Sequence, residues 1–258
     1  MKKFLHRCLL YIIRKLEYFS QIGFDLKNIR QARHLRRVGI HYSRYTLFNK
    51  KWLVDSNIQT VIDIGASVGE FTAIFAELFP AARIYAFEPL KDDVDRLRIV
   101  AERYPGRVQV FNTALGAQNG SREFNRSSWA PASSFRAMTD LHKENYPHSA
   151  GSERLKVETK RLDDVLGDKD LDGNILVKID VQGYEDEVIK GGPEVIKRAR
   201  ILVIECSLQN TYDGEPMFDG IYNLLRPLGF EYQGSLKQSI RRGDQSYLQA
   251  DCIFIKNK

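Results

Sequence analysis

The sequence is poor in cysteine, and its N-terminal segment contains no long apolar run. The 258 residues include three cysteines, Cys8, Cys206 and Cys252, which are far apart and lack the spacing of metal ligands. This pattern argues against a disulfide framework and indicates a reducing compartment. Within the first 20 residues the longest uncharged run ends at Ile13 and is too short to cross a bilayer, which takes about 20 residues. No small-residue cleavage site follows, so we expect a cytoplasmic protein without a signal peptide.

Negative charge is scarce in the first fifth of the chain. Residues 1–51 contain 13 lysines and arginines but only two acids, a net charge of +11, so the remaining 207 residues carry −5 of the total of +6. Leucine and isoleucine recur at helical spacing between residues 5 and 16, with basic side chains off that face. We therefore expect residues 1–50 to form a basic helical N-terminal extension and residues 51–258 to form a globular domain.

Three kinds of partner are open for this extension. A basic amphipathic helix over residues 1–20 can pack on the globular domain or on a second subunit of a homo-oligomer. It can instead lie on an anionic membrane surface, which would place the protein at the inner face of the membrane. Aromatic residues after position 40 could stack on RNA bases, but they equally suit a docking arm. A second helix is predicted from Leu26 to Val38, and Gly39 should end it.

The globular part opens with a strand, a glycine turn and a helix. Thr60 to Ile64 is apolar and β-branched, which is typical of a buried parallel strand. Gly65 and Gly69 carry no Cβ, so the backbone can turn tightly and approach a ligand closely. We expect Ser67 to cap a helix that runs from Phe71 to Phe79.

Acidic residues around this turn decide which ligand it suits. Asp63 precedes the first glycine and Glu70 follows the second, and the spacing is not the G-x-G-x-x-G of dinucleotide sites. Two carboxylates would repel a phosphate but would attract the ammonium and sulfonium groups of S-adenosylmethionine. Glu88 ends the next predicted strand, where α/β nucleotide folds bind ribose hydroxyls. The pattern predicts an S-adenosylmethionine site and disfavours an NAD-dependent oxidoreductase.

Predicted strands and helices alternate from Trp52 onward, which indicates an α/β fold with a parallel sheet. After the strands at residues 60–64 and 83–87, further strands are predicted at residues 108–111, 175–180 and 199–205, followed by an antiparallel pair at residues 230–234 and 247–255. We therefore expect a mostly parallel seven-stranded sheet with helices on both faces.

Five short stretches occur in a diagnostic order between Trp52 and Ile255. They are VIDIGASVGEF, YAFEP, TALG, VKIDVQGYEDEVIKGG and ILVIEC. In this order they resemble the FkbM family of S-adenosylmethionine-dependent methyltransferases, which implies a Rossmann-like class I methyltransferase fold. The family usually has glutamate at the position of Gln182, so this chain lacks one carboxylate there.

The glycine turn and the resemblance together give the expected cofactor contacts. Thr113 and Ala114 would lie over the adenine by resemblance, although a simple turn with a buried Leu115 would explain them too. The expected cofactor-binding residues are Asp63, Gly65, Ala66, Ser67, Gly69, Glu70, Phe71, Glu88, Pro89, Thr113, Ala114 and Asp180.

Methylation of a hydroxyl needs a base or a metal ion to help remove its proton. Asp180 and Glu205 end two predicted strands at the sheet edge where α/β enzymes bind substrates. An unpaired acid ending an apolar strand is costly, so we expect a function for Asp180, although Lys178 could simply neutralise it. Glu205 is a second base or a ligand for a divalent cation, or else a structural acid paired with a lysine or arginine. His142 is the third catalytic candidate, with a solvated loop residue as the alternative. No metal site is predicted from the sequence itself.

Residues 117–155 are polar and rich in serine, and they resemble the variable insertion of the family near the acceptor. We expect a loop-rich segment that recognises the substrate through Asn125, Ser133 and Ser134. Asparagine, serine and tryptophan together suit sugar hydroxyls.

The predicted function is O-methylation of a hydroxyl on a sugar, a glycan or a small metabolite. The sequence lacks the Asn/Asp-Pro-Pro-aromatic stretch of base-methylating enzymes after the fourth strand, so no nucleic acid is expected as acceptor. The alternative is a methyltransferase-like scaffold whose basic arm binds a membrane or RNA without methyl transfer.

Overall fold

The computed structural model describes residues 26–171 and 173–256, and it divides the chain into two compact units, residues 1–50 and 51–258. In the first unit, α2 (Leu26–Arg37) and α3 (Tyr42–Phe48) are helical. The predicted second helix is confirmed, and Gly39 ends it with a φ of 80°. The amphipathic helix predicted over residues 1–20 lies outside the described residues.

The exposed side of α2 is strongly basic. Its exposed arginines are Arg30, Arg33, Arg36 and Arg37. None of the four forms an ion pair with another described residue. Contact of this extension with a membrane or a second subunit stays a prediction.

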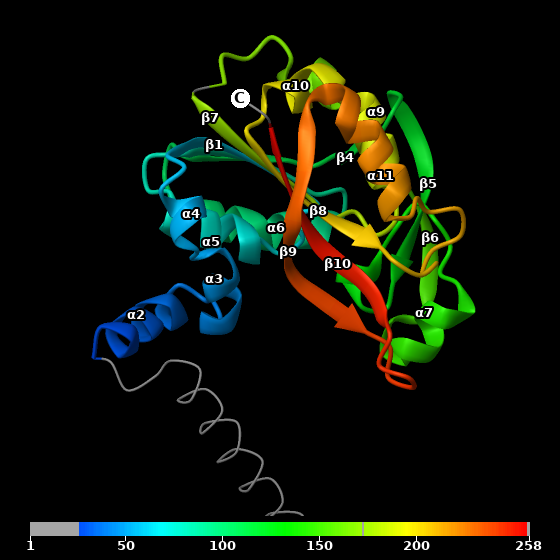
Figure 1. Ribbon diagram of the computed structural model, residues 1–258. Coiled ribbons are helices and arrows are strands. Elements are labelled where there is room, and N and C mark those ends of the chain that lie inside the picture. The colour runs from blue at the N-terminus through cyan, green and yellow to red at the C-terminus, as the bar shows by residue number, and fades with distance from the viewer. Residues whose placement is uncertain (1–25, 172, 257–258) are drawn as a thin grey trace, which may run out of the picture. The chain divides into compact units, whose positions relative to one another are not determined.

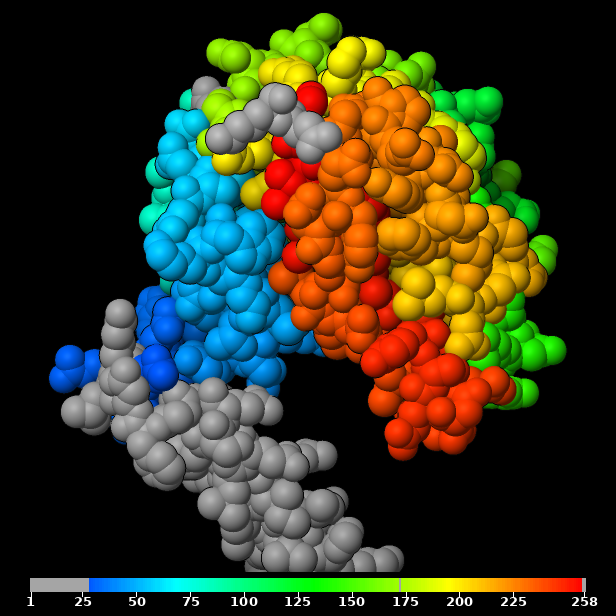
Figure 2. Space-filling model, in the orientation of Figure 1, coloured from blue at the N-terminus to red at the C-terminus, as the bar shows by residue number. Residues whose placement is uncertain are grey.

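The second unit is built on a seven-stranded sheet with the order β3-β2-β1-β7-β8-β10-β9 (Figure 1). The parallel strands are β1 (Ile58–Ile64), β2 (Arg83–Phe87), β3 (Val108–Phe111), β7 (Asn174–Ile179) and β8 (Ile201–Ser207). The antiparallel pair is β9 (Phe230–Ile240) and β10 (Tyr247–Lys256). This confirms the predicted sheet, although β9 extends six residues beyond its expected end at Gly234. As the edge strand, β9 lies on the surface of the face shown in Figure 2.

Helices cover both faces of the sheet, as predicted (Figure 1). On one face lie α5 (Glu70–Leu78) and α6 (Lys91–Ala101), where Leu97 packs with Ala86 of β2. The helices of the other face are α8 (Leu162–Leu166), α9 (Glu185–Gly191), α10 (Pro193–Arg198) and α11 (Phe218–Leu225). Here Val188, Val195 and Ile221 join strand residues in the main hydrophobic core. The short α4 (Lys51–Val54) precedes β1. The five parallel strands are mostly apolar because helices cover both faces of the sheet.

A second sheet stands beside the first and corrects one expectation. It contains β4 (Ala114–Leu115), β6 (Ser152–Lys160) and β5 (Gly120–Ser127), in that order. The segment 117–155 is therefore not entirely loop, because residues near its two ends belong to the antiparallel pair β5 and β6. The part between these strands, residues 128–151, is irregular and contains α7 (Asp140–Asn145). The alternating residues Val157 to Leu162 predict a short strand, which overlaps the end of β6. β5 was missed because its exposed face is polar, so the apolar alternation is weak.

Candidate active site

The glycine turn after β1 packs directly against the end of β7. Gly65 has a φ of 79°, and a Cβ built on it would lie 1.9 Å from the carbonyl oxygen of Asp180. Only glycine fits here, because any side chain would displace the backbone of Asp180. The turn therefore fixes where Asp180 emerges relative to β1.

Ser67 does not cap α5, contrary to our expectation. Gly69, with a φ of 90°, is the N-cap residue and has no side chain to offer. Ser67 adopts a left-handed conformation with a φ of 47°, and its amide donates to Glu88 Oε2 over 2.9 Å. Its hydroxyl is buried and has no hydrogen-bond partner. A serine before a helix gives the same sequence signal in a cap and in a turn, so the sequence could not separate the two.

Glu88 is buried at the end of β2 and organises the neighbouring backbone. Its second oxygen, Oε1, accepts a hydrogen bond from the amide of Leu90 over 2.8 Å. Burial raises the pKa of Glu88 to about 7, although the amides of Leu90 and Ser67 act in the opposite direction. Each carboxylate oxygen keeps a second lone pair, so the group can still accept hydrogen bonds from a ligand.

Asp63 lies below the same turn and is completely buried. Its Oδ2 accepts a hydrogen bond from the Thr72 hydroxyl over 2.6 Å, while its Oδ1 has no partner. Burial raises the pKa of Asp63, and the positive charge of Lys178 lowers it. Unpaired buried polar atoms are rare in folded proteins. Two of them, in Asp63 and Ser67, gather around the turn predicted to hold S-adenosylmethionine, so the residues present fit that group.

Other predicted cofactor residues belong to the same region of the chain. Ala66 is buried and donates its amide to the carbonyl of Phe87, and Glu70 is the first residue of α5. Pro89 follows Glu88, and its carbonyl accepts a hydrogen bond from the Asn112 side chain over 2.8 Å. These placements leave their contacts with a cofactor as predictions.

The buried Lys178 and the half-buried Asp180 form an ion pair at the carboxyl end of β7. Lys178 Nζ lies 3.0 Å from Asp180 Oδ2 and 4.4 Å from the ring centroid of Phe71 on α5. Burial works against the charge of Lys178, but the attraction of Asp180 and then Asp63 outweighs it and raises the pKa of Lys178. The ammonium group therefore stays charged and binds Asp180 Oδ2. The other oxygen, Oδ1, has a different partner.

That partner is Gln182, whose side-chain amide joins the two predicted catalytic acids. Its Nε2 donates to Asp180 Oδ1 over 2.8 Å and to Glu205 Oε2 over 2.7 Å. A second amide, Gln249 Nε2, also donates to Glu205 Oε2, over 3.1 Å. Glu205 is thus paired with two glutamines rather than with a lysine or arginine.

Glu205 is predisposed to hold a proton. Burial, followed by the negative charges of Asp180 and Asp251, raises the pKa of Glu205 well above its usual range. Both glutamine amides donate to Oε2, which leaves Oε1 as the oxygen that can carry the proton. The charge of Asp180 therefore favours the protonated form of Glu205.

Tyr212 was not predicted from the sequence, and it completes this cluster from the loop after β8. Its hydroxyl oxygen lies 3.0 Å from Gln182 Oε1 and 3.0 Å from the carbonyl oxygen of Ala132. His142 packs against it with 4.9 Å between ring centroids, so the third catalytic candidate lies beside the cluster. The His142 ring is buried, its Nε2 is 3.1 Å from the Ser149 hydroxyl, and burial lowers the pKa of His142 to about 4. It is therefore a neutral imidazole at pH 7.

The three predicted acceptor residues lie close to the same cluster. Ser134 is buried, and its hydroxyl donates to the carbonyl of Gln182 over 2.6 Å. This bond supports the left-handed conformation of Gln182, whose φ is 56°. The Ser133 hydroxyl accepts from the amide of Ser127, and Asn125 pairs with Ser134 through the backbone. Both serines have structural hydrogen bonds, and direct contact of the three residues with an acceptor stays a prediction.

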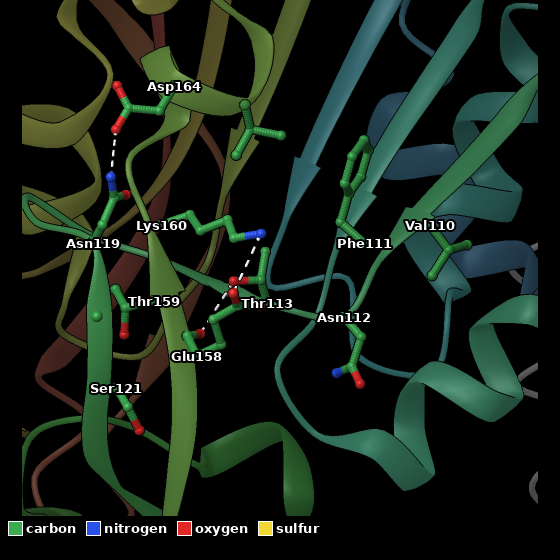
Figure 3. A pocket seen from close by; sticks show the side chains of 12 residues that line it. Val110, Phe111, Asn112, Thr113, Asn119, Ser121, Glu158, Thr159, Lys160 and Asp164 are labelled. Carbon is green, nitrogen blue, oxygen red and sulfur yellow. Dashed lines mark hydrogen bonds and ion pairs between the residues drawn. The ribbon is translucent and has the colours of Figure 1, made fainter.

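A cavity of about 880 Å³ opens at the carboxyl end of β3 (Figure 3). Its wall includes Thr113, whose hydroxyl donates to the carbonyl of Glu158 over 3.1 Å. Across the cavity, Asn119 donates to Asp164, and Lys160 lies 3.3 Å from Glu158. Neither Asp63, Glu88 nor Asp180 lines this cavity, although Thr113 and the buried Ala114 are both predicted to contact the adenine.

Two searches of the described residues gave negative results. No group of three or more histidine, cysteine, aspartate or glutamate side chains is arranged to hold a metal ion in the described part of the chain. Within residues 26–171 and 173–256, no helix is long and apolar enough to span a membrane.

Comparison with known proteins agrees with the resemblance noted from the sequence. Residues 63–232 match the family described as Methyltransferase FkbM domain. The chain is 30% identical over 181 residues to the 2-O-methyltransferase NoeI of Sinorhizobium fredii, a match that covers 67% of this chain and 73% of that protein. It is 27% identical over 143 residues to the hexuronic acid methyltransferase AglP of Haloferax volcanii, covering 55% of this chain and 54% of that protein.

Solved structures show only a distant similarity. The StiE O-MT fragment of residues 961–1257 superposes with a TM-score of 0.46 and 12% identity, covering 91% of this chain and 78% of the fragment. At this level of similarity it supports no argument about the substrate.

Proposed function

The chain belongs to the FkbM methyltransferase family, and we propose that it is an O-methyltransferase acting on a hydroxyl of a sugar, a glycan or a small metabolite. Its membership makes it a methyltransferase that uses S-adenosylmethionine. The hydroxyl acceptor is our proposal, and the observation that carries it is the cluster of Asp180, Gln182 and Glu205 beside the glycine turn.

The residues that would hold S-adenosylmethionine surround the turn after β1. Unpaired polar atoms of Asp63 and Ser67, together with the carboxylate of Glu88, offer hydrogen bonds there. When bound, the cofactor supplies a methyl group activated by a positively charged sulfur. The chain must therefore bind the acceptor, remove its proton and exclude water.

Asp180 is the group that we assign to the acceptor proton. Lys178 and Gln182 hold its two oxygens, so its orientation is fixed before any acceptor arrives. An ordinary carboxylate is a weak base, with a pKa of about 4. It can nevertheless accept the proton late in the reaction, as the hydroxyl oxygen becomes more acidic while it gains the methyl group. Asp180 and Glu205 would be the residues to hold a divalent cation if one takes part, since hard cations prefer carboxylate ligands, and it would supply a positive charge that makes the hydroxyl more acidic.

The names of two relatives support this class of acceptor. One is called a 2-O-methyltransferase, which names an oxygen as the methylated atom, and the other is called a hexuronic acid methyltransferase, which names a sugar acid. A hydroxyl rather than an amine also fits Asp180 and Glu205, because an alcohol must lose its proton to react, whereas a neutral amine already has a nucleophilic lone pair.

The experiment is a transfer assay with S-adenosylmethionine labelled in its methyl group. Acceptors would be neutral sugars, uronic acids and small hydroxylated metabolites, and products would be tested for base-stable methyl ethers. We expect label in an ether of at least one acceptor. If the label is found only in base-labile esters or in methylamines, the proposal is contradicted. If the protein binds S-adenosylmethionine but transfers no label to any acceptor, a non-catalytic scaffold is favoured.

A further inference from the structure

The irregular segment between β5 and β6 presents an exposed tryptophan. Trp129 is 45% exposed, and it is one of two tryptophans in the chain. Single exposed apolar residues are common and need no explanation by themselves. Trp129 differs because a set of aromatic rings and hydrogen bonds holds it in place.

Three aromatic side chains of this segment, Trp129, Tyr146 and His148, form what we call the aromatic platform. The rings of Trp129 and His148 meet edge to face, with 5.2 Å between centroids and an angle of 64°. The ring centroid of Tyr146 lies 6.4 Å from that of His148, also edge to face. His148 is itself exposed, so its ring supports the indole without covering it.

The backbone around the platform is fixed from both sides. The amide of Trp129 donates to the Ser127 hydroxyl over 3.1 Å, and that hydroxyl donates to the carbonyl of Ser149 over 2.7 Å. The Ser128 hydroxyl donates to the carbonyl of His148 over 2.8 Å. The indole is therefore presented from a braced turn, and a ligand would not have to order it on binding.

The platform connects to the candidate active site through a chain of contacts. Tyr146 packs on His142 with 5.2 Å between ring centroids, and His142 packs on Tyr212. The backbone gives a second connection, because the carbonyl of Ala132 lies 3.0 Å from the Tyr212 hydroxyl. Ala132 follows Trp129 by three residues, which span at most about 11 Å. An acceptor of a few sugar units could therefore reach from the acid cluster to the indole.

The chemistry of the platform suits a neutral pyranose ring. The apolar face of a sugar can lie on the indole, whose π-face is electron-rich and attracts the polarised C–H groups of the ring. The indole N–H donates to no other residue in the described part of the chain, so it can donate to a sugar hydroxyl. The nearest charged side chain in sequence, Arg126, is paired with Asp92 over 2.7 Å, so no unpaired positive charge at that position would call for a phosphate or a nucleic acid.

From these observations we infer that Trp129 is a stacking site for a pyranose unit of the acceptor, away from the unit that is methylated. The inference rests on the proposed function, which it narrows to acceptors that contain more than one sugar ring. Trp129 would then contribute to the binding of the acceptor and not to the chemical step.

The first test measures binding without methyl transfer. In Trp52→Phe, Trp129 is the only tryptophan, so its fluorescence reports directly on the platform. The probes are tetramers of β-linked glucose, α-linked glucose and N-acetylglucosamine, with glycerol as a non-ring polyol. We expect a saturable change in emission with at least one tetramer and none with glycerol. No change with any tetramer would overturn the inference.

The second test uses variants in the full-length protein. Calorimetry of Trp129→Ala should show about tenfold weaker binding of the tetramer that responds, and Trp129→Phe should restore most of it. Trp52→Ala is the matched control, because Trp52 is 40% exposed but lies in α4, and it should bind normally. Equal binding by Trp129→Ala and the parent protein would overturn the inference.

Kinetics separate this inference from the proposed function. With an acceptor that is methylated, Trp129→Ala should raise KM about tenfold and leave kcat unchanged, since stacking contributes equally to the ground state and the transition state. An unchanged KM would refute the stacking site and leave the methyltransferase proposal intact. Sugar binding that depends on Trp129, without any methyl transfer, would support the stacking site and contradict the proposed O-methyltransferase function.

Discussion

The side-chain amide of Gln182 donates a hydrogen bond to the Glu205 carboxyl group over 2.7 Å. The same nitrogen donates to Asp180, so a neutral amide stands where most family members are expected to have a carboxylate. The amide links two acids that would otherwise repel each other. The identity of residue 182 should therefore control the protonation of the whole cluster.

Gln182→Glu should make turnover strongly pH-dependent. At pH 8 the new carboxylate would face Asp180 and Glu205 with no proton to donate, and we expect turnover to fall at least about tenfold. Acidification protonates the new group and restores a donor, so turnover relative to the parent should recover toward pH 6. Gln249→Glu is the control, because Gln249 donates to Glu205 alone and over a longer distance, and its effect should be smaller. A pH–rate profile identical to that of the parent would contradict this role.

Gly65→Ala should abolish activity through the backbone. Its Cβ would lie 1.9 Å from the Asp180 carbonyl oxygen, so Asp180 would have to move. Gly106→Ala is a matched control, because Gly106 has a similar φ of 73° but no atom within 4 Å of the added Cβ. Both variants should lose about 1–2 kcal/mol of unfolding free energy to the left-handed conformation. Gly65→Ala should lose more because of the contact with Asp180, and only Gly65→Ala should lose turnover. Equal turnover of the two variants would show that the close approach to Asp180 is unimportant.

Glu88→Ala should weaken the binding of S-adenosylmethionine by about 10–150-fold, since a lost charge-assisted hydrogen bond is worth about 1.5–3 kcal/mol. Because the pKa of Glu88 is about 7, binding by the parent should also weaken as the pH falls from 8 to 6. Calorimetry that shows equal affinity for Glu88→Ala and the parent protein would remove Glu88 from the cofactor site.

Glu185 should make the protein less stable as the pH rises. Its buried Oε1 accepts hydrogen bonds from the amides of Val181 and Gly183, and burial raises the pKa of Glu185 from its usual 4.5 to about 8. A raised acid pKa means that the folded state binds the proton more tightly, so this stabilisation is full below pH 4.5 and is lost as the pH rises to about 8. Glu185→Gln keeps the acceptor but cannot ionise.

The thermal unfolding temperature of Glu185→Gln should therefore gain on that of the parent between pH 5.5 and 8. Above pH 8 the difference should become constant, because Glu185 is then ionised in both states of the parent. A constant difference across the whole range would contradict the raised pKa.

Local patterns predicted the scaffold of this site but not the connections within it. The strand before Gly65 and the acids at the strand ends follow from short apolar runs and spacing, because each strand is covered on both faces. Tyr212 could not be predicted, since it reaches Gln182 from a loop 30 residues away. The strand ends also placed Asp180 and Glu205 at the same edge of the sheet. They could not show that the side-chain amide of Gln182 lies between the two carboxyl groups and bonds to both.

The irregular segment illustrates the same limit. Its serines suggested direct contacts with an acceptor, whereas the Ser134 hydroxyl holds the backbone of Gln182. A hydroxyl that donates to a backbone carbonyl and one that contacts a ligand give the same letter in the sequence. Only the structure shows whether a serine hydroxyl is already bonded to the backbone or is available for a ligand.

Asp180→Asn tests the account most directly, with methyl transfer and cofactor affinity measured on the same preparation. We predict that turnover falls at least about 100-fold, because the amide cannot accept the acceptor proton, while the affinity for S-adenosylmethionine changes little. Chelator treatment of the parent then separates the two routes, since it abolishes turnover if a divalent cation takes part and leaves it intact if Asp180 acts alone. Near-normal turnover of Asp180→Asn at every pH would contradict the assignment of Asp180 to the acceptor hydroxyl.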